Sequence, residues 1–321
     1  MAEHGTKDVA PLASLGKPRP EQGQDSFRSG FVAIIGRPNV GKSTLLNQLL
    51  QFKLSIVSPK AQTTRHKVRG ILSTENYQAI FLDTPGAMQH ARDLLDERML
   101  ARIHEAMKEA DLIVLMVEPH LPGDIEQRLI ERLRQMSKPA ILAINKIDLV
   151  KKADLLPIID VYRQSHNFAE IVPISALKGD GLGLLQDLIV RYLPEGEPLY
   201  PPDQLTDRPE RFLVTEIIRE KVYHLYGEEI PYHTAVEIEE FQEARPKEGR
   251  NKDFIRAVIY VNKDSQKKIL IGRGGQALRQ VGILAREEIE ALLGRPVYLE
   301  LWVKTRPKWR ENSAFLRQVG Y

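Results

Sequence analysis

The feature that most constrains this chain is the glycine-containing segment G-R-P-N-V-G-K-S at residues 36–43. It directly follows the apolar run 31–35 and leads into the leucine-rich stretch 44–50. A buried strand, a glycine loop and an amphipathic helix in this order predict a phosphate-binding loop, because the loop's N–H groups and the helix dipole favour phosphate oxygens. The residues assigned to this nucleotide site are Gly36, Arg37, Pro38, Asn39, Val40, Gly41, Lys42, Ser43 and Thr44. Among them, Lys42 is expected to reach the β- and γ-phosphates and Ser43 to ligate Mg²⁺.

Two later segments predict the rest of a magnesium and γ-phosphate site. The polar, basic segment 58–67 has no helical or strand period, so we predict a loop. One of its threonines, Thr64 or Thr63, is expected to complete the Mg²⁺ shell when a γ-phosphate is present. Asp83 follows a predicted strand and begins D-T-P-G, in which the N–H of Gly86 can meet the γ-phosphate. The predicted metal ligands are Ser43, Thr64 and Asp83, and the predicted catalytic residues are Lys42, Thr64 and Gly86.

Ala87 bears on the rate of hydrolysis. It stands directly after Gly86, where many small signalling GTPases have a glutamine that orients the attacking water. An alanine side chain cannot do this. We therefore predict slow intrinsic hydrolysis, on the order of 10⁻⁴ to 10⁻² s⁻¹, unless an ion, a partner or another residue positions the water.

The tetrapeptide N-K-I-D at residues 145–148 predicts the base. Guanine presents N1–H and N2–H₂ as two donors on one edge, and the Asp148 carboxylate accepts both. Adenine lacks that pair of donors, and sites of this kind discriminate by roughly 10⁴-fold. After the last predicted strand comes S-A-L, whose Ala176 N–H is expected to meet guanine O6. The residues assigned to the base are Asn145, Lys146, Asp148, Ser175, Ala176 and Leu177.

Alternating buried strands and helices predict an α/β fold with a doubly wound, mostly parallel sheet for residues 29–197. The preceding residues 1–28 contain prolines and glycines with little apolar periodicity, and we predict a disordered tail rather than a secretory signal. Four prolines in residues 194–202 predict a semi-rigid, proline-rich linker, placed at 198–207. The chain is long enough for a second, smaller domain at 208–321.

The second domain is expected to have the order α-β-β-α-α-β, with I-G-R-G-G at 271–275 between two helices. Two interpretations exist for this glycine loop. A dinucleotide-binding motif would need a buried strand before it and more than the roughly forty residues that follow. A G-x-x-G clamp for single-stranded nucleic acid fits the helix pair, the element order and a half-domain (250–321) with fifteen Lys or Arg against seven Asp or Glu. The residues assigned to RNA binding are Ile271, Gly272, Arg273, Gly274, Gly275, Lys267, Lys268 and Arg279.

The basic tail at 305–310 also leaves two possibilities open. Trp309 can pack back onto the core, or it can stack on RNA bases while neighbouring cations pair with phosphates.

The chain resembles the Era family of bacterial ribosome-assembly GTPases, which carry a C-terminal type II KH domain. The resemblance covers residues 29–320 and rests on the phosphate loop, Q-T-T-R at 62–65, D-T-P-G at 83–86, N-K-I-D and the G-x-x-G loop. It implies GTP hydrolysis and binding of small-subunit ribosomal RNA near its 3′ end, in support of 30S assembly. It also implies a cytoplasmic location with peripheral contact to the membrane. In relatives with an asparagine at the position of Asn39, that side chain helps bind K⁺, so K⁺ joins Mg²⁺ as an expected cofactor. We expect a monomer.

Three classes of function are compatible with a phosphate loop and a basic second domain. A GTP-gated RNA-binding switch is favoured. A constitutive RNA-binding scaffold would use its nucleotide only to stabilise the fold. A metabolic enzyme is disfavoured by Asp148 and by the lack of a further catalytic cluster, while the absence of cysteine excludes disulfides and thiolate metal sites.

Overall fold

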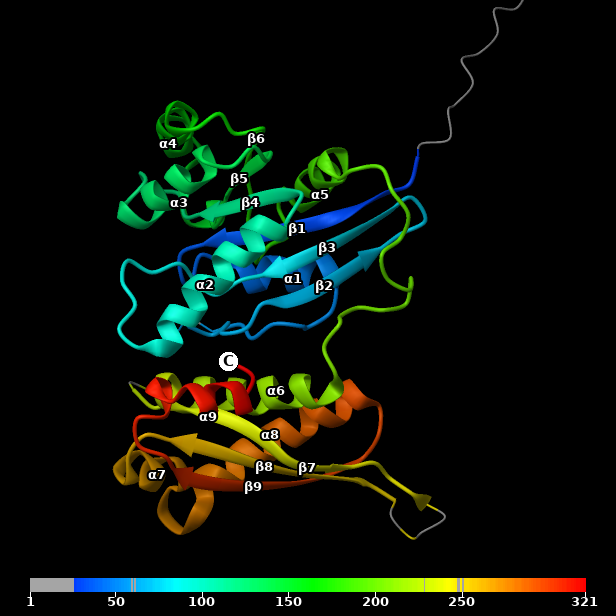
Figure 1. Cartoon of the computed structure of the whole chain (residues 1–321), viewed down its shortest axis with the longest axis vertical. Coiled ribbons are helices and arrows are strands. Elements are labelled where there is room, and N and C mark those ends of the chain that lie inside the picture. The colour runs from blue at the N-terminus through cyan, green and yellow to red at the C-terminus, as the bar shows by residue number, and fades with distance from the viewer. Residues whose placement is uncertain (1–25, 59, 61, 228, 247–248, 250) are drawn as a thin grey trace, which may run out of the picture.

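A computed structural model of the chain describes residues 26–321 apart from 59, 61, 228, 247, 248 and 250. The disordered tail was predicted for residues 1–28, most of which lie outside the described part. The fold has two bodies, a larger α/β body and a smaller one below it in Figure 1, joined by a segment that runs down one side. Among the described residues, no helix is both long and apolar enough to cross a membrane.

The larger body is built on a six-stranded sheet in the order β2-β3-β1-β4-β5-β6. Four neighbouring pairs are parallel and only the edge strand β2 runs antiparallel to its neighbour β3. Apolar clusters fill both faces, as expected for strands without polar alternation. These findings confirm the predicted mostly parallel α/β sheet. In chain order its elements are β1 (Arg28–Gly36), α1 (Lys42–Leu50), β2 (Val68–Ser73), β3 (Tyr77–Asp83), α2 (Leu94–Glu109), β4 (Leu112–Val117), α3 (Asp124–Arg134), β5 (Ala140–Ile144), α4 (Lys152–Ser165), β6 (Glu170–Pro173) and α5 (Leu182–Tyr192).

The smaller body is built on a three-stranded sheet in the order β7-β8-β9. β8 pairs antiparallel with β7 and parallel with β9, and α6 and α8 cover one face. This arrangement confirms the predicted α-β-β-α-α-β order of a KH domain, and a short helix, α9, follows it. The elements are α6 (Glu210–Leu225), β7 (Ala235–Gln242), β8 (Asp253–Val261), α7 (Asp264–Ile271), α8 (Gln276–Leu293), β9 (Val297–Thr305) and α9 (Ser313–Gln318).

The segment between the bodies differs from the semi-rigid spacer expected from its prolines. The side chain of Gln78 accepts hydrogen bonds from the N–H groups of Leu199 (2.7 Å) and Tyr200 (2.9 Å). The N–H of Ile71 in β2 donates to the Leu205 carbonyl at 2.9 Å. An edge strand offers free backbone groups, and this linker satisfies some of them. It is therefore fixed to the larger body rather than spanning open solvent.

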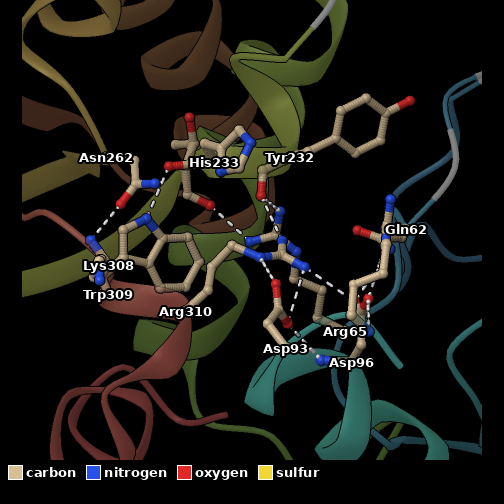
Figure 2. Close-up of polar contacts among 12 residues, drawn as sticks. Gln62, Arg65, Asp93, Asp96, Tyr232, His233, Asn262, Lys308, Trp309 and Arg310 are labelled. Carbon is tan, nitrogen blue, oxygen red and sulfur yellow. Dashed lines mark hydrogen bonds and ion pairs between the residues drawn. The ribbon is translucent and has the colours of Figure 1, made fainter. Parts of the chain in front are cut away.

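Trp309 packs inside the protein. It is fully buried, and its indole N–H donates to the His233 carbonyl at 2.9 Å (Figure 2). With Phe315 and Tyr321 it belongs to an apolar cluster that also contains Leu95 from α2 of the larger body. The tail that follows β9 thus ties the two bodies together, and the RNA-stacking alternative for Trp309 is wrong in this conformation.

Candidate nucleotide and RNA sites

The phosphate loop joins the end of β1 to the start of α1, as the sequence predicted. Lys42 is buried, and its Nζ donates to the carbonyls of Gly36 (3.1 Å) and Arg37 (2.7 Å). Burial lowers the pKa of Lys42 to about 8, and the nearby Asp83 carboxylate opposes this shift. Gly41 has a φ of 103° and lies so close to Asn145 that a Cβ atom would come within 2.2 Å of its amide nitrogen. This position therefore requires glycine.

The three predicted Mg²⁺ ligands converge at the start of α1. The Ser43 Oγ lies 3.0 Å from the Thr64 Oγ1 and 3.3 Å from the Asp83 Oδ2, while Thr64 Oγ1 lies 3.4 Å from the same Oδ2. The other oxygen, Asp83 Oδ1, is buried without a hydrogen-bond partner among the described residues. Burial raises the pKa of Asp83, against the opposing effect of Lys42 and the hydroxyls. Hard oxygen ligands beside a phosphate loop fit Mg²⁺.

The two candidate threonines are placed differently. Thr64 faces Ser43 and Asp83, whereas the Thr63 carbonyl accepts a hydrogen bond from Arg219 of the smaller body. The geometry thus favours Thr64 as the ligand.

The D-T-P-G turn lies directly against the phosphate loop. A Cβ atom on Gly86 would come within 2.6 Å of the Pro38 backbone, and the Ala87 N–H donates to the Gly36 carbonyl at 2.9 Å. Ala87 is buried, and its side chain carries no polar group that could hold a water molecule. A pocket lies between the phosphate loop, Thr64 and Gly86, and the apolar Ile56 and Val57 also line it. The sequence analysis missed these two residues, because nothing in their sequence distinguishes them from core residues.

The base-side residues come together at the carboxyl ends of β5 and β6. The Asn145 amide donates to the Val40 carbonyl and accepts from the Ala176 N–H, both at 2.8 Å. Asn145 therefore links the phosphate loop to the S-A-L turn. Since the Ala176 N–H is engaged by Asn145, the structure does not show it directed to a guanine O6. Asp148 accepts from the Ser175 hydroxyl at 2.6 Å, which orients its carboxylate.

Lys146 and Leu177 complete the base-side set. Lys146 adopts a left-handed backbone conformation with a φ of 66° and pairs with Glu118. Leu177 is 69% exposed. An apolar side chain this exposed is available to cover the face of a base.

In the smaller body, the G-x-x-G loop connects α7 to α8. Gly272, Gly274 and Gly275 have φ values of 75°, 59° and 78°. A Cβ atom on Gly272 would come within 2.6 Å of that of Ala277, so the turn depends on glycine. Arg273 is exposed at the tip. A helix, and not a strand, precedes the loop, so the dinucleotide-binding alternative is wrong.

An apolar groove with a basic rim runs from this loop between α8 and β9. Its lining includes residues that the sequence analysis did not assign, namely Lys252, Leu278, Gly282, Ile283, Arg286 and Tyr298. The assigned Arg279 lies on the rim, and Lys268 is exposed on α7, which leads into the loop. The missed residues lie on α8 and β9 or just before β8, and only the packing of these elements brings them together.

Comparison with known proteins agrees with the two domains of the fold. A family model described as 50S ribosome-binding GTPase matches residues 31–146, and one described as KH domain matches residues 229–310. Among solved structures, Era in complex with MgGDPNP and nucleotides 1506–1542 of 16S ribosomal RNA is 44% identical, with a TM-score of 0.88. The match covers 92% of this chain and 99% of that one. This chain belongs to the Era family. Aquifex aeolicus Era bound to GDP and aluminium fluoride matches to the same extent. As an Era-family member the protein is a GTPase, which hydrolyses GTP to GDP and phosphate.

The arrangement around Asp148 yields a test of base recognition. Asp148→Asn replaces one acceptor oxygen by a donor, which suits xanthine, because xanthine has an acceptor where guanine has its N2 amino group. We expect GTP affinity to fall by roughly 10³- to 10⁴-fold and XTP affinity to rise, as measured by competition against a fluorescent nucleotide. An unchanged preference for GTP over XTP would contradict the assigned role.

Proposed function

We propose that this Era-family GTPase is a GTP-gated RNA-binding switch. The observation that carries the proposal is that one short segment, residues 62–65, contacts both the nucleotide site and the KH domain. Ordering of this segment by GTP and Mg²⁺ changes how the KH domain sits, and RNA and GTP must then affect each other's affinity equally.

The roles of the nucleotide-site residues form part of this proposal. The backbone of the phosphate loop and Lys42 hold the phosphates, and Ser43, Thr64 and Asp83 would hold Mg²⁺. The ion, when bound, neutralises charge between the β- and γ-phosphates. Gly86 offers its N–H to the γ-phosphate because no side chain stands in the way. Asp148, held by Ser175, selects guanine.

The proposed RNA partner is small-subunit ribosomal RNA near its 3′ end, and the proposed role is assistance in 30S assembly. The support comes from the Era structure with a 16S ribosomal RNA segment and from the G-x-x-G loop. Glycines at this loop let the sugar–phosphate chain approach the backbone closely, and the apolar groove accepts unstacked bases. Arg273, Lys268 and Arg279 add phosphate contacts. The family resemblance alone supports two finer proposals, a cytoplasmic monomer and peripheral contact with the membrane.

Replacing the centre of the glycine loop tests this RNA site. In the double variant Arg273→Asp/Gly274→Asp, two carboxylates face the phosphates in place of a cation, and the loop projects into solvent. We expect affinity for a 3′-terminal small-subunit RNA fragment to fall by at least about tenfold and the salt dependence to become shallower, with GTP hydrolysis retained. Arg134→Glu, on α3 of the larger body, serves as the control for a change from positive to negative charge and should leave RNA affinity unchanged. Equal effects of both variants would contradict the site.

A potassium ion is the proposed substitute for the missing glutamine. Asn39 has a left-handed backbone with a φ of 63° and lines the pocket formed with Lys42, Ser43 and Thr64. We expect GTP turnover in KCl to exceed that in NaCl by at least about tenfold, because a fixed cation would take over part of the work of an arginine finger. Equal turnover in the two salts, at matched ionic strength, would count against the ion.

A further inference from the structure

Two adjacent residues of the 62–65 segment face opposite bodies. Thr64 turns toward Ser43 and Asp83 in the nucleotide site, whereas Arg65 is fully buried within the smaller body. The Arg65 guanidinium donates to the main-chain carbonyls of Thr234 (2.6 Å), Pro231 (2.9 Å) and Tyr232 (3.1 Å) and to the hydroxyls of Tyr223 (3.1 Å) and Tyr321 (3.2 Å). Every one of these acceptors belongs to the KH domain or the C-terminal tail.

The two residues before Thr64 are held by the same body. The Tyr223 hydroxyl donates to the Gln62 carbonyl at 2.8 Å, and Arg219 donates to the Thr63 carbonyl. Both donors lie on α6, the first helix of the KH domain, and Arg219 is itself fully buried. The backbone just before Thr64 and the side chain just after it are thus held by groups outside the GTPase domain, while the Arg65 carbonyl accepts from Arg102 of α2 at 2.9 Å.

A second set of contacts holds the region after the D-T-P-G turn. Arg310, from the tail, donates to Asp93 at 2.6 Å and to Asp96 at 3.0 Å, at the start of α2 (Figure 2). The Gln62 amide also donates to Asp96 at 3.3 Å. Figure 2 shows Arg65 and Arg310 side by side between the two bodies. Arg65 extends from the larger body to the smaller one, and Arg310 extends from the tail to the larger body. The 62–65 segment and the start of α2, which follows the D-T-P-G loop, are therefore both tied to the KH domain and its tail.

We propose that the KH domain positions Thr64 for GTP hydrolysis, and that Arg65, Arg219 and Tyr223 are positioning residues for this reaction. The inference rests on the proposed nucleotide roles and specifies how the site is regulated. Residues 62–65 lie in no helix or strand. The position of Thr64 therefore depends on the contacts that hold its neighbours. A displacement of about 1 Å in such a group can lower a rate by about 10²-fold. Because Ala87 supplies no polar group, the reaction depends strongly on the groups that remain.

The burial of Arg65 indicates that docking of the KH domain favours GTP hydrolysis and that undocking slows it. A guanidinium removed from water needs partners for its donors, and among the described residues the acceptors of both terminal nitrogens of Arg65 lie in the KH domain and the tail. Undocking leaves Arg65 to be hydrated and releases the backbone beside Thr64. RNA that changes the docking of the KH domain will therefore change the hydrolysis rate, even though it binds on α8 and β9.

A matched pair of tyrosine variants tests the inference. Tyr223→Phe keeps the buried ring but removes the hydroxyl that donates to Gln62 and accepts from Arg65. Tyr226→Phe removes a hydroxyl that donates to the Leu270 carbonyl, entirely inside the KH domain. We expect Tyr223→Phe to lower kcat for GTP by about five- to tenfold, which is the factor expected if the free energy of one buried hydrogen bond is lost from the arrangement that holds Thr64. GDP affinity should stay unchanged, because GDP has no γ-phosphate and does not require Thr64. Tyr226→Phe should leave kcat within twofold of the wild type.

The measurements are single-turnover hydrolysis at saturating GTP and Mg²⁺, and GDP affinity as a check that the nucleotide site is folded. Arg65→Lys keeps the charge but loses the planar guanidinium that donates to several acceptors at once, and it should lower kcat at least as much as Tyr223→Phe. If Tyr223→Phe loses GDP binding, the Arg65→Lys result decides. The inference is overturned if the kcat values of Tyr223→Phe and Arg65→Lys equal that of an active wild-type protein. It is also overturned if Tyr226→Phe lowers kcat as much as Tyr223→Phe does. An RNA affinity that is the same with GDP and with a GTP analogue would instead contradict the proposed switch. It would not affect the conclusion that these residues position Thr64.

Discussion

The burial of one positive charge organises the region between the two bodies. The Arg65 guanidinium is withdrawn from water, and its acceptors come from a turn before β7, from α6 and from the last residue of the chain. These segments meet only when the larger body, the KH domain and the tail are packed together. The conformation of the 62–65 segment, the docking of the KH domain and the burial of the tail are therefore parts of one arrangement, and none can change alone.

The chemistry of the nucleotide site is simple by comparison. A lysine, two hydroxyls and a carboxylate surround the start of α1, and Asp148, which accepts from Ser175, is the carboxylate proposed to select guanine. Ala87, which stands where many small signalling GTPases have a glutamine that orients the attacking water, is buried against the phosphate loop. Such a site suits a slow reaction whose rate is set by how well the surrounding loops are held. An enzyme of this kind can time a binding event rather than process a flux of substrate.

The sequence predicted those parts of the fold that depend on local pattern. The mostly parallel sheet of the first domain and the α-β-β-α-α-β order of the second were predicted correctly, because the apolar patterns of elements such as β5 and α8 are long or continuous. The α4 helix was missed, since it contains Pro157 and buries only Leu155 and Tyr162. Ser43, Thr64 and Asp83 could be grouped in advance because their motifs have a known order. The contacts of Arg65 with residues some 160 to 250 positions away have no local signature, and neither has the docked linker.

The measurement that tests the account most directly is the affinity of the intact protein for a 3′-terminal small-subunit RNA fragment in two nucleotide states. With Mg²⁺ present, binding is compared between saturating GDP and a saturating non-hydrolysable GTP analogue. The account predicts that the two affinities differ by at least about fivefold, and that RNA changes the relative affinity of GDP and the analogue by the same factor. Equal RNA affinity in both states would contradict a GTP-gated switch and favour a constitutive RNA-binding scaffold with a structural nucleotide.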